Sequence, residues 1–442
     1  MAMKAYESYK NTEYDWLPRI PAHWIRHSVR KITSVSSERN ENTFSRNDLL
    51  SVYREYGVIK KFSRDDNHNV ESLDLSKYKT VHKNYLVINK MKMWQGSLGI
   101  SKYDGIVSPA YIVCKLNLAN VNYQFIHALL RAATFKTFYN RISYGVRVGQ
   151  WDASYEDLKS LNLYLPPKEE QDQIVRYLDW QNSRLNKLIN AKKREIALLE
   201  EQKQALISQA VTKGLDPHAP LKDSGIDWIG QIPEHWLLCN LKYLCSMKSG
   251  KNLTSIQITE NGPYPVYGGN GVRGYYSQYN VSGECLIIGR QGALCGNVHY
   301  VHEKIWATDH AVVTQVSNFI HLKFFYYLLT AMNLNRYASQ TAAQPGLAVS
   351  NILNQKVCFP PINEQRKIAV YLEHQCIFID NLINNINKTI SLLQEYRTRL
   401  VADVVTGQID VRHIAIPNYE AITETIGQPE ADEDSTICTE DQ

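Results

Sequence analysis

Two short stretches of the chain set a glutamine among glycines, each directly after a run of aliphatic residues. Residues 93–99 read MWQGSLG, and residues 289–296 read GRQGALCG. Because glycine lets the backbone turn tightly or approach a ligand closely, such turns can present a polar side chain to a partner. The amide of Gln95 or Gln291 can form two hydrogen bonds with adenine, and Arg290 can bind guanine or a phosphate. The pattern offers base-reading chemistry, although a plain hairpin would also explain it.

A glycine-rich loop offers a second kind of contact. Residues 267–276, YGGNGVRGYY, contain a literal G-x-G-x-x-G. The residues after it do not open a helix, and no acidic residue stands about twenty positions further on, so dinucleotide binding is not indicated. A loop that carries Asn270 and Arg273 between tyrosines fits a nucleic-acid groove or a phosphate better. A comparable polar loop surrounds Gly145 and Gly149.

These loops, with the basic and aromatic residues near them, are the candidates for DNA contact. In the first half of the chain they are Lys90, Lys92, Trp94, Gln95, Arg141, Tyr144, Arg147 and Gln150. In the second half they are Lys251, Tyr267, Asn270, Arg273, Tyr275, Arg290, Gln291 and Arg336. Any one of them alone could be ordinary surface, so the hypothesis depends on the cluster.

The charge distribution agrees with a polyanionic partner. The net charge is +5 at pH 7, but residues 420–442 hold eight Asp or Glu and no Lys or Arg, which leaves the rest of the chain at about +13. Residues 24–150 contain 20 Lys and Arg against 9 Asp and Glu, and residues 236–356 contain 9 against 4. Two basic blocks fit DNA, although a solvated basic surface has the same composition.

The sequence contains none of the common catalytic or metal-binding motifs. It has no P-loop, no [DN]-P-P-[YFW] methyltransferase motif, no H-E-x-x-H and no G-x-S-x-G, and its eight cysteines include no C-x-x-C. We therefore expect no catalytic residue, no metal and no cofactor in this chain. Because no apolar run of eighteen residues and no signal-peptide core occur, we expect a cytoplasmic protein without a membrane segment.

The elements that would position these loops form an internal repeat. Residues 15–24, DWLPRIPAHW, return as DWIGQIPEHW at 227–236, an offset of 212. Residues 165–216 return at 359–410, an offset of 194, with 19 of 52 positions identical. The region between these frames is therefore 18 residues shorter in the second copy, and its sequence diverges. The histidine in each copy of the first repeated segment, residues 15–24 and 227–236, could suggest a catalyst. The two tryptophans and the prolines of the same segment instead indicate a packing lock between the insert and the helix.

Each Pro-Pro pair in the repeat is followed by the pattern of a long helix. Prolines suit a helix start, and no further proline occurs for tens of residues. Leucine or isoleucine recurs every seven residues at 372, 379, 386, 393 and 400, and leucines at 178, 185, 199 and 206 follow the same spacing with one polar interruption at Lys192. Roughly 42 residues at 1.5 Å each give a rod of about 63 Å. We expect the helices to pair antiparallel; two ordinary core helices at different places in the fold are the alternative.

The fold class that follows is α+β, with two tandem α+β domains and two long helices that pair as an antiparallel coiled coil in a pseudo-two-fold repeat. Each insert combines strand-like runs, such as 85–88 and 285–288, with helical stretches. The expected segments are a first domain at 1–165, a first helix at 166–216, a second domain at 217–359, a second helix at 360–412, and an acidic, disordered tail at 413–442.

This arrangement resembles the specificity subunit of a Type I restriction-modification enzyme. The resemblance rests on W-x-x-x-I-P-x-H-W, a variable α+β region, P-P-x-x-E-Q at the start of a long helix, and a second copy of the whole pattern, and it covers residues 10–412. It implies that each insert is a target-recognition domain that reads one half of a split, asymmetric sequence in double-stranded DNA, while the helices set the spacer. The tail after Glu420 departs from the minimal pattern of the family.

The resemblance also implies partner subunits that carry the chemistry. Two modification subunits, with S-adenosylmethionine and adenine-N6 methyl transfer, would dock on the helices and frames. Restriction subunits, with ATP and Mg for translocation and cleavage, would complete the assembly. Two alternatives stay open. One is a stand-alone DNA-binding regulator on the same scaffold, and the other is an enzyme with an active site that matches no known motif. Co-purification with a methyltransferase would distinguish the regulator from the specificity subunit, and methyl transfer by the isolated chain would support the enzyme.

Overall fold

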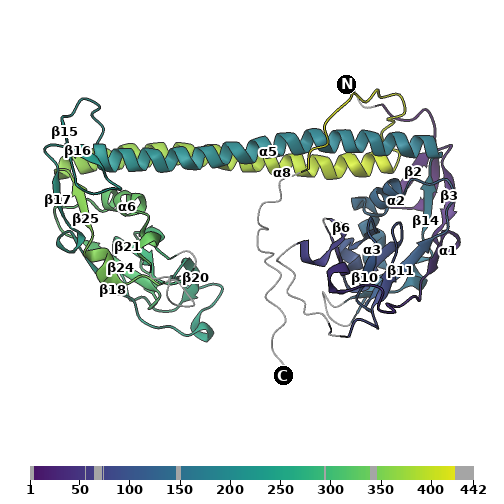
Figure 1. Cartoon of the computed structure of the whole chain (residues 1–442), viewed down its shortest axis with the longest axis horizontal. Coiled ribbons are helices and arrows are strands. Elements are labelled where there is room, and N and C mark those ends of the chain that lie inside the picture. Colours follow the sequence, from purple (N-terminus) through teal and green to yellow (C-terminus); the bar gives the residue numbers. More distant parts are fainter. Residues whose placement is uncertain are drawn as a thin grey trace. The chain divides into compact units, whose positions relative to one another are not determined.

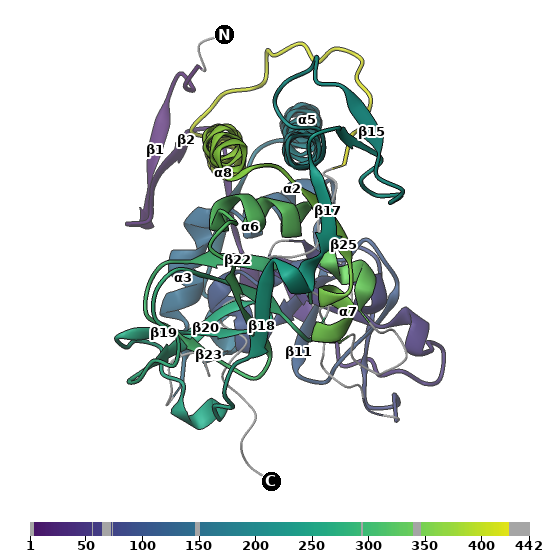
Figure 2. The ribbon, with the colours of Figure 1, turned by 90° about the vertical axis from the view of Figure 1, so that its left-hand side faces the viewer.

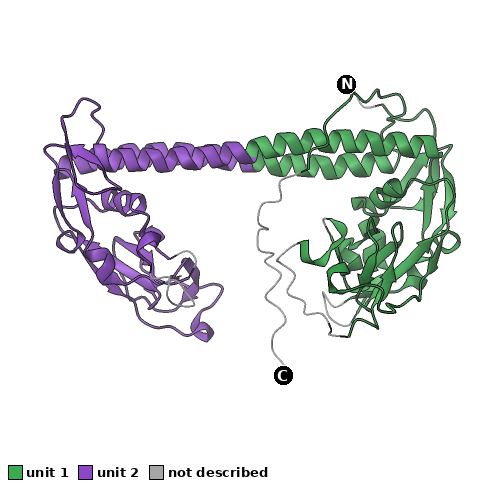
Figure 3. Ribbon diagram, in the orientation of Figure 1, with its two compact units in different colours: residues 1–192, 388–442 green, residues 193–387 purple. Residues whose placement is uncertain are grey.

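The computed structural model describes residues 4–54, 56–63, 72, 74–145, 151–292, 295–338 and 346–423. It divides into two compact units, residues 1–192 with 388–442, and residues 193–387 (Figure 3). Each unit contains one α+β domain and about half of each of two long helices, α5 (Lys168–Lys213) and α8 (Ile362–Val405). The predicted α+β class and the internal repeat are confirmed. The sequence-based division made each long helix a segment of its own, whereas each compact unit contains part of both helices.

The first unit is built on a four-stranded antiparallel sheet. Its strand order is β4 (Thr33–Val35), β11 (Tyr111–Leu116), β8 (Leu86–Asn89) and β9 (Leu98–Ile100). Side chains alternate between its faces. Leu86 and Ile88 face the main core with α2 (Tyr123–Leu130), whereas Val87 joins a smaller core formed by the short strands β5 (Leu50–Tyr53), β6 (Gly57–Lys60), β7 (Lys79–Val81) and β10 (Gly105–Val107).

The second unit repeats this sheet in the same order. The strands are β18 (Cys245–Ser249), β24 (Ala311–Val316), β21 (Cys285–Gly289) and β22 (Val298–Val301), and α6 (Leu322–Ala331) takes the place of α2 (Figure 1). A further sheet contains β20 (Gly271–Tyr276), β19 (Tyr264–Gly268) and β23 (Trp306–Ala307). The inserts therefore share a fold even though their sequences diverge.

Matching strand pairs join each insert to its frame. In the first unit, β3 (Ile25–Ser28) pairs with β14 (Asn162–Leu165), so the insert leaves and re-enters the frame at one place. In the second unit, β17 (Leu237–Asn240) pairs with β25 (Lys356–Phe359).

The remaining elements of the first unit are β1 (Tyr9–Tyr14), β2 (Leu17–Pro21), α1 (Val29–Ile32), η1 (Arg46–Asp48), η2 (Lys61–Ser63), η3 (Lys90–Gln95), η4 (Ala133–Phe135), α3 (Lys136–Arg141), β12 (Ser143–Tyr144), β13 (Asp152–Ala153) and α4 (Tyr155–Leu158). Those of the second are β15 (Leu221–Asp223), β16 (Gln231–Pro233), η5 (Leu241–Tyr243), η6 (Ser255–Gln257), η7 (Leu334–Tyr337) and α7 (Val349–Leu353).

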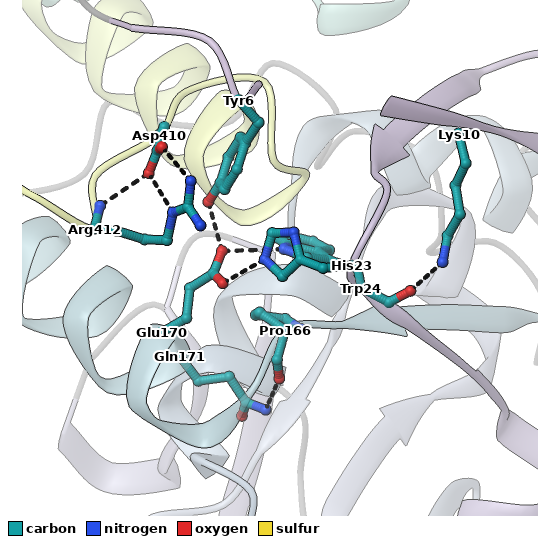
Figure 4. A network of polar contacts seen from close by, with 9 residues as sticks. All are labelled: Tyr6, Lys10, His23, Trp24, Pro166, Glu170, Gln171, Asp410 and Arg412. Atoms are coloured by element: carbon teal, nitrogen blue, oxygen red, sulfur yellow. Dashed lines mark hydrogen bonds and ion pairs between the residues drawn. The ribbon is translucent and has the colours of Figure 1, made fainter. Parts of the chain in front are cut away.

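The repeated Trp/His frame is the packing lock that the sequence predicts. Trp24 is 1% exposed, and its Nε1 donates to Glu170 in the first turn of α5 (3.1 Å), while Nε2 of His23 lies 2.7 Å from the other carboxylate oxygen (Figure 4). Glu170 also accepts a hydrogen bond from the Tyr6 hydroxyl, at 2.7 Å. A carboxylate in the first turn suits the positive end of the helix dipole. Burial, together with this hydrogen bond, raises the pKa of the Tyr6 phenol, so the phenol stays protonated as a donor.

The second frame repeats the lock. Trp236 is fully buried and donates from Nε1 to Glu364 (3.1 Å), and Nε2 of His235 lies 2.9 Å from the same carboxylate. The next residue of each helix contacts the insert: Gln171 accepts from the backbone of Asn122 and donates to Pro166, and Gln365 bonds in the same way with His321 and Pro360. In the repeated P-P-x-x-E-Q pattern, the glutamate therefore binds the frame and the glutamine binds the insert.

The two long helices pair in opposite directions within each unit. In the first unit, Ile174 and Leu178 from the start of α5 share a core with Leu400 and Val404 from the end of α8. In the second, residues of α5 near its end, such as Val211, share a core with the start of α8. The helix ends lie side by side in two views (Figures 1 and 2). The predicted antiparallel pairing is confirmed.

Residues 413–423 differ from the expectation of a disordered tail. Ser183 Oγ donates to the carbonyl of Glu420 (2.6 Å), and side-chain amides of α5 donate to the carbonyls of Ile422 (2.8 Å) and Thr423 (3.0 Å). The expectation was wrong for this part of the tail, because hydrogen bonds and packing of Ile414 and Ile416 on the core fix its backbone. Residues 424–442 lie outside the described part of the chain.

Candidate nucleic-acid interface

The candidate residues follow the same edge of the sheet in both units. In the second unit, β18 and β21 both run antiparallel to β24, and their last residues, Ser249 and Gly289, lie opposite Val312 and Ala311 at its start. In the first unit, the end of β8 lies opposite Tyr111 at the start of β11, and the end of β4 lies opposite Cys114 in the same strand. Lys90 follows β8 and Arg290 follows β21, so equivalent strand ends present the predicted turns.

Three segments converge at this edge in the second unit. Arg290 lies between two of them: its Nη1 is 3.3 Å from Ser249 Oγ, and its Nε donates to the Leu347 carbonyl at 3.3 Å. The backbone of Gln291 bridges to Gly346, and its side chain is exposed. The guanidinium of Arg290 is therefore held in place by its neighbours, whereas the amide of Gln291 is available to a ligand.

The glycine loop is a two-residue hairpin turn between β19 and β20. Gly268 pairs with Gly271, which leaves Gly269 and Asn270 at the tip. A Cβ on Gly289 would lie 1.9 Å from the Gly269 carbonyl oxygen, so only glycine permits the hairpin to contact the end of β21. The second half of the G-x-G-x-x-G pattern lies in a strand, β20, rather than at the start of a helix.

The other candidates of the second unit lie on the segments around this hairpin. Asn270, Arg273, Lys251 and Arg336 are exposed, and Tyr267 and Tyr275 are half-buried. Burial raises the pKa of the Tyr267 phenol. Arg336 belongs to η7, which lies beside the turn after β21, because a Cβ on Gly296 would be 2.6 Å from the backbone of Asn335.

The first unit gathers its candidates around η3. The rings of Trp94 and Trp151 meet edge to face with centroids 5.3 Å apart, and Lys90 Nζ forms an ion pair with Asp152 at 2.6 Å. Gly96 ends η3 with a φ of 89°, a conformation that favours glycine. Trp94, Gln95 and Arg141 line one hollow, Lys90 and Tyr144 line another, and Lys92 is exposed on η3.

Besides Lys90, two further candidates of the first unit already have acidic partners. Arg141 donates to both carboxylate oxygens of Asp15 in the frame, at 2.9 and 2.6 Å, and these hydrogen bonds hold the pKa of Asp15 below its usual value. Tyr144 donates to Asp157 at 2.9 Å, which raises the pKa of the phenol. The Arg141–Asp15 ion pair joins the insert to its frame. A phosphate would therefore have to compete with Asp15 for Arg141. Arg147 and Gln150 lie outside the described residues.

Sequence reasoning missed three basic residues at this surface. Arg54 and Lys136 line the hollow beside Trp94 and Gln95, and Lys79 lines the one beside Lys90 and donates to the Tyr111 carbonyl at 2.5 Å. Desolvation lowers the pKa of Lys79, with a contribution from nearby cations. Each follows an aromatic residue, but none lies in a glycine-rich turn like those around Gln95 and Gln291, and only the packing of distant elements brings them to the candidates.

The described residues lack the features of two other kinds of site, a metal centre and a membrane span. Within those ranges, no three His, Cys, Asp or Glu side chains are grouped so that they could hold a metal ion. None of the helices in the same ranges combines the length and the apolar character needed to cross a membrane.

Comparison with known proteins finds relatives of one kind. The family model described as "Type I restriction modification DNA specificity domain" matches residues 27–198 and 233–392. The EcoprrI specificity subunit of Escherichia coli is 42% identical over 149 residues, which cover 33% of this chain and 36% of that protein. The MjaVIII specificity subunit of Methanocaldococcus jannaschii is 24% identical over 397 residues, 83% of this chain and 86% of that protein.

A solved structure shares the fold. A chain in the structure that describes complex assembly and conformational transition of the type I R-M system matches with a TM-score of 0.62. The match has 15% sequence identity and covers 88% of this chain and 99% of that one. The similarity therefore extends over both inserts and both long helices.

Proposed function

Because the chain belongs to the Type I restriction-modification DNA specificity domain family, we propose that its two inserts each read one half of a bipartite, asymmetric target in double-stranded DNA. The observation that supports this most directly is the duplicated sheet edge, where Arg290 and Gln291 in one unit and Lys90 to Gln95 in the other follow equivalent strands. Basic side chains around such an edge would bind phosphates, and the exposed amides and guanidinium groups would read bases.

The proposal assigns the chemistry to other subunits. The chain's named relatives are specificity subunits, and in such systems catalysis lies elsewhere in the complex. Two modification subunits, which bind S-adenosylmethionine and methylate adenine, dock on the helices and frames. Restriction subunits that use ATP and Mg join them. In this assembly, α5 and α8 hold the two readers at a fixed spacing.

Substitution of Gln291 tests base reading. We expect Gln291→Ala to relax specificity at a position in one half-site, at about 1 to 3 kcal/mol for the base that it reads, because its backbone bridge to Gly346 does not involve the side chain. Sequencing of methylated adenines in cells that carry the complete system gives the recognised sequence. Lys251→Ala is the matched control, since loss of a phosphate contact weakens all sequences alike and reduces the salt slope by about 1. Equal weakening at every base position by Gln291→Ala would exclude its role as a reader.

Helix length tests the spacer. One heptad inserted at the middle of both α5 and α8 keeps the apolar stripes in register and lengthens each helix by about 10 Å, which corresponds to at most about three base pairs. We expect the gap between the two half-sites to increase while the half-sites themselves stay the same. A heptad inserted in α5 alone would make α5 about 10 Å longer than α8, so that contacts between the paired helix ends would be lost, and is expected to destabilise the protein. An unchanged gap after the double insertion would refute the spacer role.

A further inference from the structure

Residues 413–423, the C-terminal strap, cover one face of α5 in the first unit. The backbone of Ile422 donates to Ser183 Oγ at 2.9 Å, and Ser183 donates in turn to the Glu420 carbonyl. Further along α5, Asn186 and Asn190 donate to carbonyls of the strap. Most of these contacts join α5 side chains to the strap backbone, so the α5 face is suited to hold an extended segment.

The internal repeat gives this face a counterpart on α8, at an offset of 194 residues. Exposure differs at two of the matched positions. Tyr177 is 3% exposed, whereas its counterpart Tyr371 is 37% exposed. Ser183, which bonds to the strap, is 4% exposed, whereas its counterpart Ile377 is 54% exposed. The two equivalent helix faces therefore differ where the strap covers Ser183, while Arg176, Arg184 and Leu188 stay exposed on α5.

The open face of α8 is strongly apolar. Beside Tyr371 and Ile377 it carries Val370 (53% exposed), Phe378 (61%) and Leu382 (36%). These positions fall at helical spacing, so they form one stripe on the half of α8 that belongs to the second unit. Contiguous exposed apolar side chains of this kind mark protein interaction sites. Hydrophobic contact with another protein would remove this stripe from water.

We propose that the strap makes the two docking faces unequal: a modification subunit binds first to the open face of α8, and a second copy binds to the α5 face only when the strap is displaced. This inference rests on the proposed function, which supplies two identical partners for two related faces. The strap competes directly with the second partner, because both need Ser183 and its neighbours. The hydrogen bonds between α5 and the strap must therefore be exchanged before the second copy can bind.

The test isolates one face at a time. Ile377→Asp places a charge in the open face, and the remaining affinity of this variant for the purified modification subunit reports the α5 face. In that background, a chain that ends at Pro417 loses the bonds of Glu420, Ile422 and Thr423 but keeps Ile414 and Ile416 in the core. We expect calorimetric titration to show binding that is about tenfold tighter or more after truncation, and about tenfold weaker first binding for Ile377→Asp in the full chain.

Control variants separate this inference from the proposed function. Ile256→Asp adds the same charge to an exposed apolar position in η6 of the second insert, not on α8, and first binding should stay the same. Equal affinity of the strapped and truncated chains, or equal losses for Ile256→Asp and Ile377→Asp, would overturn the inference and leave the proposed function standing. If neither the full chain nor the truncated chain binds the modification subunit, the proposed function fails, and the inference fails with it.

Discussion

Replacement of Trp236 by alanine is expected to lower the free energy of unfolding by about 3 to 5 kcal/mol. The indole is fully buried, and its Nε1 donates to Glu364 in the first turn of α8. Its ring also contacts the end of α5, because a Cβ on Gly214 would lie 3.3 Å from Cζ2 of Trp236. The substitution would thus leave a cavity where the frame, the start of α8 and the end of α5 meet, and the half-buried carboxylate of Glu364 would lose a donor.

Urea denaturation followed by circular dichroism measures this loss. Trp228→Ala in the same frame is the matched control, because Trp228 is only half-buried and should cost clearly less. Trp24→Ala should behave like Trp236→Ala, since the first frame makes the same indole-to-carboxylate contact. A loss below about 1 kcal/mol for Trp236→Ala would mean that the frame does not hold the helix ends together.

Exchange of one insert is expected to replace one half of the recognised sequence completely. The structure places the junctions at β3 and β14, where Ser28 pairs with Asn162 and Ile25 with Leu165. A graft of residues 29–161 from a relative with a different target would leave this strand pair within the original chain. The other half-site and the spacer should stay as they were, because the graft leaves α5, α8 and the second insert unchanged.

Two contacts across the junction decide whether the graft is held correctly. Gln171 accepts a hydrogen bond from the Asn122 backbone, and Arg141 forms an ion pair with Asp15. The donor insert should therefore supply equivalents of Asn122 and Arg141. The matched experiment exchanges residues 241–355 between β17 and β25 and should change the opposite half-site. Genome-wide mapping of methylated adenines is the measurement for both grafts. A change in both half-sites from a single graft would contradict independent reading by the two inserts.

The frames, the long helices and their repeat could be predicted from the amino-acid sequence alone. These features depend on local or strictly periodic signals: proline at a helix start, an apolar residue every seven positions, and tryptophans that recur with their neighbours. It also indicated that Trp24 and Trp236 pack in the core. Antiparallel pairing followed because two related helices in one chain can bury their stripes on each other.

The tertiary structure alone decided which polar residues share a surface. Lys79 and Arg54 approach the predicted η3 cluster through strand pairings between segments distant in sequence, and Gly269 contacts Gly289 only because two hairpins meet. Arg141, expected to face DNA, also bonds to Asp15 of the frame. Residues 413–423, expected to be disordered, lie along α5. A helix forms bonds four residues apart and is therefore readable from its pattern, whereas long-range contacts depend on how whole elements pack.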